Sequence, residues 1–529
     1  MKTFCVQTLG CKVNQYESEQ LCSFLKLRGL RQTTVDDAEL RIINTCSVTV
    51  QAASQSRQSV RRVTRLPVLS SLPLGQPVEA TALHEPQCSV QAPHASSRPR
   101  VVVVGCWATS DKSAAAALPG VDAVFTHHDN LAAELDRLLK RWDSASQGHR
   151  AGLPELHDRA IAAPPGLKKD DIRWIEAGAA ASGRTGDNKS KPPAKVNENH
   201  APGANSLPLF GDHQAGRQRA FLKVQDGCDA HCTYCIIPQL RRTLWSKSID
   251  QAVQEAARLV AAGHVELVLT GIFLGAYGQT TALRRRQPDT GVSPLARLVE
   301  ALCKNVIGLR RVRLSSLEPL DLTDDLLAVL KSHPQVVPHF HLPLQSGSDA
   351  ILRRMNRQYR RDDFLRMVEH VRDAFDRPAL TTDIIVGFPD ETDDHFEQTL
   401  DVARQAGFIH IHAFGYSPRP GTAAARWTDR FVRGPIVNTR IGQLRELAEA
   451  NSLEFRRQFL GEILEVITER DEVDAAQAPL CHGRCERYFS VWFEGSRTRP
   501  GQAVRVRIER IMSSRTFGIA LDQPVEAAQ

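Results

Sequence analysis

Three cysteines, Cys228, Cys232 and Cys235, occur in one short segment with the spacing C-x3-C-x2-C. The segment closely follows Phe221–Val224, a run typical of a β-strand. Three closely spaced thiolates can bind three irons of a cubane cluster, which leaves the fourth iron without a protein ligand. An iron that is open in this way can bind a small molecule and transfer an electron to it. Zinc, with His231 as a further ligand, is the alternative, but the spacing and context favour the cluster.

Three more cysteines lie far apart in the sequence, but each one comes just after a predicted strand. Because the carboxyl ends of parallel strands share one edge of a sheet, these thiols could converge there. We therefore expect a second three-thiolate cluster site, again with an open iron. The alternative is that they are ordinary small core residues, since free cysteine is often buried. The strands and cysteines are Phe4–Leu9 with Cys11, Leu40–Thr45 with Cys46, and Val101–Val104 with Cys106.

The elements that position these cysteines begin with two α/β regions. Up to about Trp142 strands and helices alternate, with a fourth strand at Ala123–Phe125, which predicts a parallel sheet covered by helices. From Arg219 six strands alternate with helical patterns such as Ile249–Ala262 and Asp394–Ala406, which predicts a barrel or an open part-barrel. Its strands are expected at Phe221–Val224, Val265–Leu269, Arg310–Leu314, His339–Leu342, Thr381–Val386 and Ile409–Phe414.

The region after about Ala448 has a different pattern. Glu465–Thr468, Tyr488–Phe493 and Ala503–Ile508 alternate like antiparallel strands and predict a small β-barrel. Arginines in or beside these strands would give it a basic surface, although such charges are often only a solvated face. They are Arg484, Arg487, Arg497, Arg499, Arg505, Arg507, Arg510 and Arg515.

Two stretches interrupt this organisation. Leu66–Pro99 is rich in Pro, Ser and Gln, and the stretch from Asp143 to Gly216 is rich in Ala, Gly, Pro, Lys and Asn. We expect an insertion and a linker, both partly disordered connectors without a catalytic role.

Composition narrows the class of protein. The chain has 529 residues, 42% of them apolar, and a formal net charge of +7, which permits a nucleic-acid partner without establishing one. The sequence contains no uninterrupted apolar stretch of about 18 residues, so we expect no membrane span. Its first residues also lack the apolar core of a signal peptide. We therefore expect a cytoplasmic protein with no membrane partner. In such a chain the 12 cysteines are expected to be ligands or reactive groups, not disulfides.

The C-x3-C-x2-C loop at the end of the first barrel strand resembles the radical S-adenosylmethionine superfamily. The resemblance implies that S-adenosylmethionine chelates the open iron and is cleaved to a 5′-deoxyadenosyl radical. Gly271, after the second strand, and Gly387, within Thr382–Glu391 after the fifth, resemble stretches that line the S-adenosylmethionine site. Both are therefore expected to bind this cofactor, although a glycine after a strand is commonly only a turn.

The chain as a whole is similar to the methylthiotransferase family, except in the insertion and the linker. Two independent three-cysteine sets occur in the order expected for that family. The segments that match are Thr8–Ser18, Asn44–Thr49, Gly105–Ala108, Asp226–Pro238, Arg313–Pro319 and His341–Asn356.

This resemblance implies a domain plan and two 4Fe-4S clusters. Residues 1–142 would bind the auxiliary cluster that delivers sulfur, 143–217 would be the linker, 218–448 the radical domain and 449–529 an RNA-binding TRAM barrel. Two molecules of S-adenosylmethionine would supply the methyl group and the radical, and a flavodoxin- or ferredoxin-type reductant protein would supply electrons. The implied ligands are Cys11, Cys46 and Cys106 for the auxiliary cluster, and Cys228, Cys232 and Cys235 for the radical cluster.

The segments Lys12-Val13-Asn14-Gln15 and His339–Pro343 look like the branch that acts on N6-threonylcarbamoyladenosine beside the anticodon of tRNA. The tRNA anticodon stem-loop is then the expected partner. Other branches act on isopentenyladenosine in tRNA or on an aspartate of a small-subunit ribosomal protein, and a non-catalytic iron–sulfur RNA-binding protein is a further alternative. Thr109, Phe273 and Arg241–Trp245 depart from the family pattern near the cofactor pocket while leaving the cluster ligands intact.

The remaining cysteines have no ligand-like spacing, with one partial exception. Cys481-His482-Gly483-Arg484-Cys485 could suggest zinc, but no second pair follows, and the stretch resembles the RNA-facing turn of a TRAM barrel. Packing or free thiols are expected at Cys5, Cys22, Cys88 and Cys303.

Overall fold

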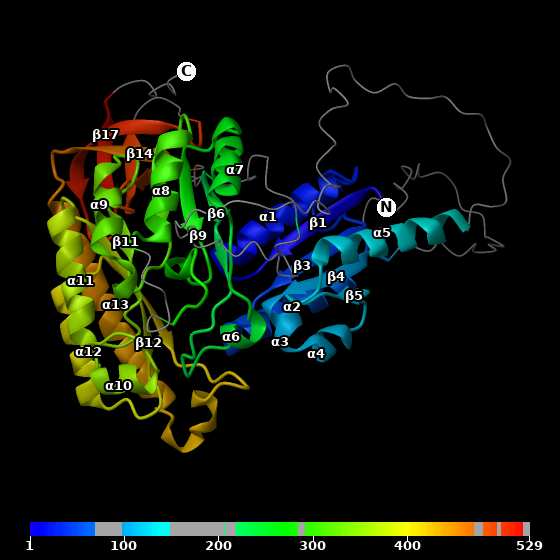
Figure 1. The fold of residues 1–529 in the computed structure, drawn as a ribbon, viewed down its shortest axis with the longest axis horizontal. Helices are drawn as coiled ribbons and strands as arrows, with labels where there is room; N and C mark the ends of the chain where they lie inside the picture. The colour runs from blue at the N-terminus through cyan, green and yellow to red at the C-terminus, as the bar shows by residue number, and fades with distance from the viewer. Residues whose placement is uncertain are drawn as a thin grey trace, which may run out of the picture. The chain divides into compact units, whose positions relative to one another are not determined.

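The computed structural model describes residues 1–68, 98–148, 207, 218–283, 291–469, 480–494 and 499–521 (Figure 1). Cys88, Arg497 and most of the expected insertion and linker lie outside these residues. The chain forms two units, one made of residues 1–135 and 196–529 and the other of residues 136–195. The elements that carry the candidate sites all belong to the first unit.

The N-terminal sheet has five parallel strands in the order β2-β1-β3-β4-β5, which confirms the predicted parallel sheet. β3 is buried throughout and β4 from its second residue on, and in β4 this burial explains the continuous run of four valines. The strands are β1 (Thr3–Thr8), β2 (Arg31–Gln32), β3 (Leu40–Thr45), β4 (Arg100–Gly105) and β5 (Ala123–Val124). The helices are α1 (Lys12–Lys26), α2 (Val50–Arg65), α3 (Cys106–Ser110), α4 (Lys112–Ala116) and α5 (Leu131–Gly148).

Six parallel strands form the predicted part-barrel. They make two three-stranded sheets, linked by isolated bridges between Val312 and Val336 and between Ser316 and His341. The strands are β6 (Arg219–Lys223), β9 (Glu266–Thr270), β10 (Arg311–Leu314), β11 (His339–His341), β12 (Ala379–Val386) and β13 (His410–Gly415).

Helices cover the outside of these strands (Figure 1). No helix in the described part of the chain is long and apolar enough to cross a membrane. The helices are α7 (Ile249–Ala261), α8 (Pro294–Asn305), α9 (Asp324–Ser332), α10 (Asp349–Arg354), α11 (Arg361–Ala374), α12 (Asp393–Ala406) and α13 (Gly434–Arg457). Shorter elements beside the radical cysteines are β7 (Gln225–Asp226), α6 (Ile237–Leu240) and β8 (Trp245–Ser246).

The barrel strands alternate between an apolar outer face and a polar inner face. Outward residues such as Leu222, Val312 and Ile411 pack in the core with the helices. Because side chains alternate across a strand, their neighbours must point into the barrel. We call these inward residues the barrel interior: Arg219, Lys223, Glu266, Arg313, His339, His341, Asp383, His410, His412 and Phe414.

The C-terminal strands form a closed barrel in the order β14-β15-β16-β18-β17. All strand pairs are antiparallel except β16 with β18, which pair in parallel. Cys481 and Cys485 are buried in the barrel core, whereas His482 and Arg484 alternate with them on the other face. The strands are β14 (Ile463–Thr468), β15 (Cys481–Cys485), β16 (Ser490–Glu494), β17 (Ala503–Ile511) and β18 (Thr516–Ala520).

α13 continues to Arg457, through the position at which the sequence predicts a domain boundary. One predicted surface arginine of the C-terminal barrel, Arg487, instead contacts the part-barrel domain, where it donates to the Arg377 carbonyl at 3.2 Å. Arg484 lies over the ring of Tyr488 within the C-terminal barrel itself. The predicted domain bounds remain a prediction.

A buried ion network joins α1 to the part-barrel. Lys223 Nζ lies 2.8 Å from Glu17 Oε1 and 2.6 Å from Asp226 Oδ2. Arg241 Nη1 lies 2.8 Å from Glu17 Oε1 and 2.9 Å from Asp226 Oδ1. Burial raises the pKa of Glu17, but Arg241 and Lys223 outweigh this effect and bring it to about 2. Two carboxylates and two cations are therefore balanced in a space closed to water.

Replacing Arg241 should weaken the fold, because Arg241→Met leaves buried carboxylates with one cation in place of two. We expect the free energy of unfolding to fall by about 3–5 kcal/mol in urea denaturation. Arg242→Met is the matched control, because Arg242 is exposed and should change stability by about 0.5 kcal/mol or less. Equal losses for the two variants would contradict the network's role.

Candidate functional site

The structure brings Cys11, Cys46 and Cys106 together at the carboxyl edge of the N-terminal sheet. Asn14 Oδ1 lies 3.8 Å from Cys11 Sγ and 4.0 Å from Cys106 Sγ. A Cβ atom added to Gly10 would lie 3.0 Å from Cys46 Sγ, which places the third thiol against the same loop. Three thiols from three strand ends therefore surround the start of α1.

Asn14 organises this group, and the sequence analysis did not single out its role. Its Nδ2 donates to the Leu9 carbonyl at 2.9 Å and to the Thr45 carbonyl at 3.0 Å, so one amide joins the ends of β1 and β3. α1 has no acidic residue in its first turn and no side-chain cap at Cys11. Its free backbone N–H groups therefore favour negative charge on nearby thiolates.

Gly105 allows the ends of β3 and β4 to approach each other, just before Cys46 and Cys106. Its φ is 95° and its ψ is −161°, a conformation open almost only to glycine. A Cβ there would lie 2.4 Å from Asn44 Oδ1 and 2.5 Å from the Thr45 carbonyl oxygen. Any side chain must therefore push the ends of the two strands apart.

Gly105→Ala should destabilise the N-terminal sheet by more than backbone strain alone. Gly29→Ala is the matched control, because Gly29 has a φ of 81° with nothing within 4 Å of an added Cβ. The control should cost about 1–2 kcal/mol, and Gly105→Ala clearly more, in thermal or urea unfolding. The account of this strand contact fails if the two losses are the same.

Cys228, Cys232 and Cys235 lie in the loop after β7, held by backbone hydrogen bonds. The Cys228 N–H donates to the Arg241 carbonyl at 3.1 Å, and the Cys235 N–H donates to the Cys232 carbonyl at 3.1 Å. Burial raises the pKa of Cys228 and of Cys235 to about 12. A bound metal centre would reverse this effect, because coordination to a cation deprotonates a thiol.

Arg357 contacts the radical loop and was missed from the sequence. Its Nη1 donates to Cys232 Sγ at 3.1 Å and its Nη2 to Glu318 Oε1 at 2.5 Å. Burial lowers the pKa of Arg357, but the Glu318 carboxylate outweighs this and raises it, so the guanidinium stays charged. A fixed cation beside Cys232 stabilises a thiolate there. The one signal in the sequence that could have pointed to Arg357 is its position directly after His341–Asn356, a segment that matches the family.

Both thiol sets adjoin α6. This helix begins two residues after Cys235. Cys106 packs against Leu240 of the helix and against Ile236, the residue that precedes it. The positive charge of Arg241, at the end of α6, also acts on the Cys106 thiol. The same short helix is therefore next to a cysteine of each set.

The donor chemistry of each set fits a cubane cluster better than a single metal ion. In the described part of the chain, no group of three or more His, Cys, Asp or Glu side chains is arranged so that it could hold a single metal ion. A cubane spreads its thiolates over separate irons, and three thiols leave one iron open. The assignment of the six cysteines as ligands remains a prediction.

Gly271 and Gly387 lie directly after β9 and β12, as expected, but each closely approaches another part of the chain. A Cβ on Gly271 would lie 2.9 Å from the Gln225 side chain, and one on Gly387 would lie 2.4 Å from Val437 Cγ2. The Gly387 N–H also donates to Glu391 Oε2 at 2.7 Å. Their expected contact with S-adenosylmethionine remains a prediction.

Tyr488 from the C-terminal barrel contacts the barrel interior and was predicted only as part of a strand. It has a φ of 75°, and its ring stacks on His339 with centroids 4.2 Å apart. The guanidinium carbons of Arg313 and Arg219 lie 5.0 Å and 5.4 Å from the ring centroid. The C-terminal barrel therefore adds an aromatic group to a cationic interior.

Lys12, next to Cys11, lies close enough to Tyr488, Arg219 and Arg313 for their charges to affect its pKa. Burial lowers the pKa of Lys12, and Arg219 and Arg313 lower it further, whereas Tyr488 and Asp383 raise it. The start of α1 therefore brings a thiol and an ammonium group to neighbouring places.

The fold and thiol loop define a radical S-adenosylmethionine enzyme. Residues 222–403 match the model of the Radical SAM superfamily, and residues 3–72 match that of Uncharacterized protein family UPF0004. A solved structure of TsrM, a radical S-adenosylmethionine methyltransferase from Kitasatospora setae, is 13% identical with a TM-score of 0.46, covering 80% of this chain and 77% of that one.

Full-length relatives identify the family. The threonylcarbamoyladenosine tRNA methylthiotransferase MtaB of Bacillus subtilis is 31% identical, over 96% of this chain and 94% of that protein. MtaB of Thermotoga maritima is 30% identical, over 96% and 95%. The tRNA-2-methylthio-N(6)-dimethylallyladenosine synthase of Acidothermus cellulolyticus is 31% identical, over 96% and 86%. The chain belongs to the radical S-adenosylmethionine methylthiotransferase family, whose chemistry implies a 4Fe-4S cluster and S-adenosylmethionine.

Proposed function

We propose that this enzyme methylthiolates carbon 2 of N6-threonylcarbamoyladenosine next to the anticodon of tRNA, using two 4Fe-4S clusters. The observation that carries the proposal is the presence of two three-thiol sets that both adjoin α6. The names of the relatives support tRNA methylthiolation, and those of the two MtaB relatives support this base. A flavodoxin- or ferredoxin-type protein is the proposed reductant.

The chain's own residues would hold, charge and shield the reacting groups. When bound, the clusters and S-adenosylmethionine supply a radical that removes the hydrogen of carbon 2, the sulfur that replaces it and the methyl group. Cys228, Cys232 and Cys235 would hold the radical cluster, with Arg357 stabilising its thiolates. Cys11, Cys46 and Cys106 would hold the auxiliary cluster around Asn14. Gly271 and Gly387 would border the S-adenosylmethionine site.

The polar barrel interior favours the threonylcarbamoyl base over isopentenyladenosine. Arg219, Arg313, His339 and His341 are inward residues of three strands, and Lys12 lies near the first two. Burying an isopentenyl group among such side chains would desolvate charges without replacing their hydrogen bonds. A substituent with a carboxylate and hydroxyl group can replace them.

The C-terminal barrel, within proposed residues 449–529, presents rings and arginines suited to RNA. The rings of His482 and Trp492 stack with centroids 6.0 Å apart, and the guanidinium of Arg515 lies 5.3 Å from the Trp492 ring centroid. A groove of about 790 Å³ runs beside them, lined by residues that include Arg445 and His410 of β13. Rings can stack on unpaired bases and arginines can contact phosphates.

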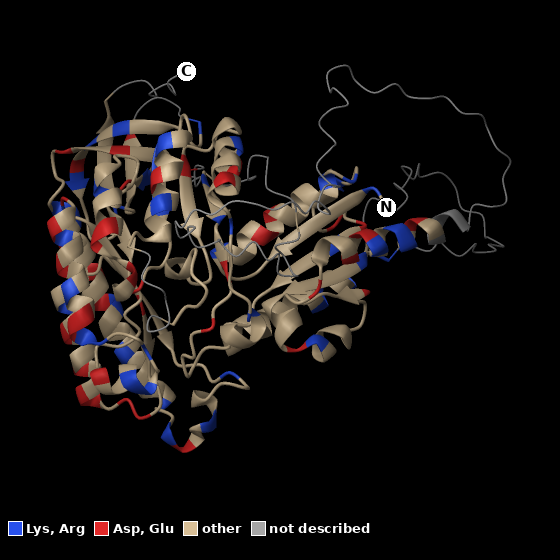
Figure 2. Cartoon of the chain, in the orientation of Figure 1, with Lys and Arg blue, Asp and Glu red and all other residues tan. Residues whose placement is uncertain are grey.

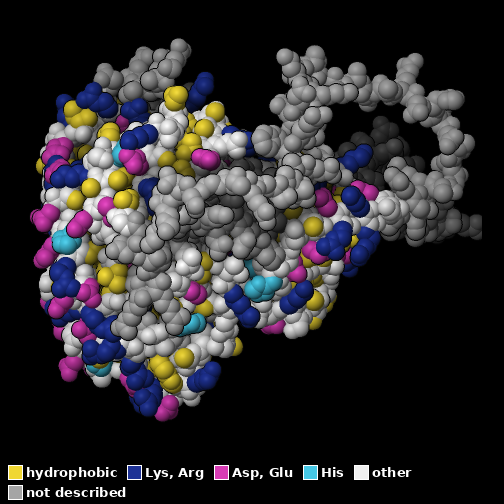
Figure 3. All heavy atoms as spheres, in the orientation of Figure 1, with side chains coloured by type: hydrophobic (Ala, Val, Ile, Leu, Met, Phe, Trp, Pro, Cys, Tyr) yellow, Lys and Arg dark blue, Asp and Glu magenta, His cyan; other side chains and the backbone are white. Residues whose placement is uncertain are grey.

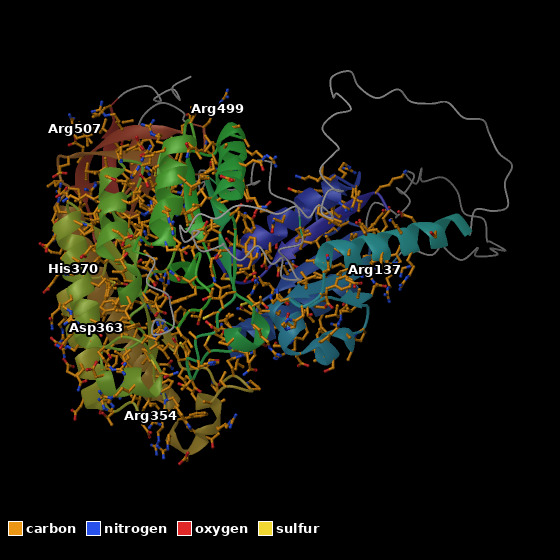
Figure 4. All side chains as sticks on the ribbon, in the orientation of Figure 1. Arg137, Arg354, Asp363, His370, Arg499 and Arg507 are labelled. Atoms are coloured by element: carbon orange, nitrogen blue, oxygen red, sulfur yellow. The ribbon has the colours of Figure 1, made fainter. Side chains whose placement is uncertain are left out.

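Exposed basic side chains on the C-terminal barrel are candidates for contact with RNA. Basic and acidic residues alternate along α11 and α12 (Figure 2). On the C-terminal barrel, Arg499 and Arg507 point outward (Figure 4). In the space-filling view, basic side chains lie beside apolar ones at this end of the visible face (Figure 3). The exposed arginines proposed to contact RNA are Arg499, Arg505, Arg507, Arg510 and Arg515.

The proposed reaction can be tested by nucleoside mass spectrometry. The chain would be expressed in a bacterium that lacks its own enzyme of this branch, and bulk tRNA would be digested. We expect 2-methylthio-N6-threonylcarbamoyladenosine with the wild-type chain and none with Cys11→Ala or Cys228→Ala. Cys303→Ala is the control, because Cys303 packs in the helical core away from both sets and should leave the product unchanged. Absence of the product despite intact iron content would contradict the choice of base.

RNA binding should weaken with salt, because arginines that contact phosphates displace condensed counterions. We expect the affinity for a tRNA anticodon stem-loop to fall by at least about 10-fold between about 50 and 200 mM salt. Arg505→Gln should reduce this salt dependence. The control Arg366→Gln, at an exposed arginine of α11 paired with Asp363, should not. An affinity unaffected by salt would exclude a phosphate-binding surface.

A further inference from the structure

Lys12 is a partly buried cation that forms no ion pair with the residues that the structure describes. Among the described residues, no carboxylate lies within ion-pair distance of its ammonium group, although its side chain is only partly exposed. Other cations nearby are paired with carboxylates, since Arg313 Nε lies 2.8 Å from Glu266 Oε1 and Lys223 pairs with Glu17. Asp383, the nearest inward carboxylate on β12, instead lies 3.2 Å from His341 Nε2. Lys12 is therefore available to an anion that the described residues do not provide.

The location of Lys12 restricts which anion can reach it. Lys12 is the first residue of α1 and directly follows Cys11, and α1 packs against β6 of the part-barrel. An anion bound by Lys12 therefore lies beside the proposed sulfur-delivering cluster, on the helix that packs against the part-barrel. A backbone phosphate cannot easily enter such a space, whereas a base unstacked from a loop can.

The chemistry of the proposed substrate provides such an anion. Carbon 2 and N6 both lie on the Watson–Crick edge of adenine, so a base that offers carbon 2 to the clusters also brings its N6 substituent into the interior. The threonylcarbamoyl group ends in a carboxylate. An ammonium group and a carboxylate form a charge-assisted hydrogen bond, which is strong where water is excluded.

Aromatic rings on β13 could support the base itself. The rings of His412 and Phe414 are nearly parallel, at 12°, with centroids 6.3 Å apart, and Phe414 is 45% exposed. His341 meets His412 edge-on from β11. An exposed phenylalanine ring on the inner face offers a surface on which a flipped base can stack.

We propose that Lys12 binds the carboxylate of the threonylcarbamoyl group and thereby selects this base over one with a neutral N6 substituent. This inference rests on the proposed function and adds the residue that sets its specificity. Lys12 is a substrate-binding residue in this account and takes no part in holding either cluster.

The test compares two anticodon stem-loop RNAs with the full-length, anaerobically reconstituted enzyme. One carries N6-threonylcarbamoyladenosine, and in the other the threonine carboxylate is replaced by a primary amide of nearly the same shape. We expect the wild-type enzyme to prefer the carboxylate RNA by about 10- to 100-fold in kcat/KM for methylthiolation. Lys12→Met should bring this ratio close to 1 by slowing reaction of the carboxylate RNA alone.

Two further variants separate charge from structure. Lys12→Arg keeps the charge and should retain most of the preference. Lys26→Met, at the exposed end of the same helix, should leave the ratio unchanged. Since both RNAs are assayed with one preparation, incomplete cluster loading caused by a change next to Cys11 cancels in the ratio.

The outcomes distinguish this inference from the proposed function. A wild-type enzyme that methylthiolates both RNAs equally overturns the role of Lys12 and leaves the proposed function standing. An unchanged preference in Lys12→Met also overturns it. A wild-type enzyme that cleaves S-adenosylmethionine but methylthiolates neither RNA overturns the proposed function, and the inference with it.

Discussion

The contact between α1 and the first barrel strand is the constraint on which the candidate site depends. Glu17 on α1 is buried against Lys223 of β6 and Arg241 beyond α6, and neither side can separate without leaving charges unpaired. The neighbouring Tyr16 hydroxyl donates to Glu255 Oε1 of α7 at 2.7 Å. Two consecutive residues of α1 therefore fix how the N-terminal sheet meets the part-barrel.

The two thiol sets and Lys12 take their positions from that contact. Cys11 and Lys12 lie at the start of the helix whose middle is fixed by Tyr16 and Glu17. With α1 fixed, Cys106 meets α6 directly after the radical loop, and Lys12 lies near the cationic interior. In the proposed function one set would serve radical formation and the other would hold the sulfur, and both would have to reach the same substrate atom.

The sequence predicted the elements whose pattern is local. The run of valines in β4, the alternation of the C-terminal strands and the spacing of Cys228, Cys232 and Cys235 are visible in neighbouring residues, and the predicted fold class is confirmed. The convergence of Cys11, Cys46 and Cys106 required the further rule that parallel strands end at one edge.

Features that depend on distant residues could not be predicted in this way. The contacts of Asn14 with Thr45, and of Arg357 with Cys232, join positions far apart in sequence. Tyr488 read as a strand residue, but its positive φ and its stacking on His339 depend on how the C-terminal barrel docks. The sequence also predicted Arg487 as part of a basic surface. It instead contacts the Arg377 carbonyl, which again depends on how the C-terminal barrel docks.

The most direct test of the account is whether hydrogen leaves carbon 2 of the base under the control of the radical site. An anticodon stem-loop deuterated at carbon 2 of N6-threonylcarbamoyladenosine would be incubated with the reconstituted enzyme, reductant and S-adenosylmethionine. Mass spectrometry would then follow both the RNA and 5′-deoxyadenosine. The account predicts deuterium in 5′-deoxyadenosine in step with the methylthiolated product. Product that forms while 5′-deoxyadenosine remains unlabelled would contradict it.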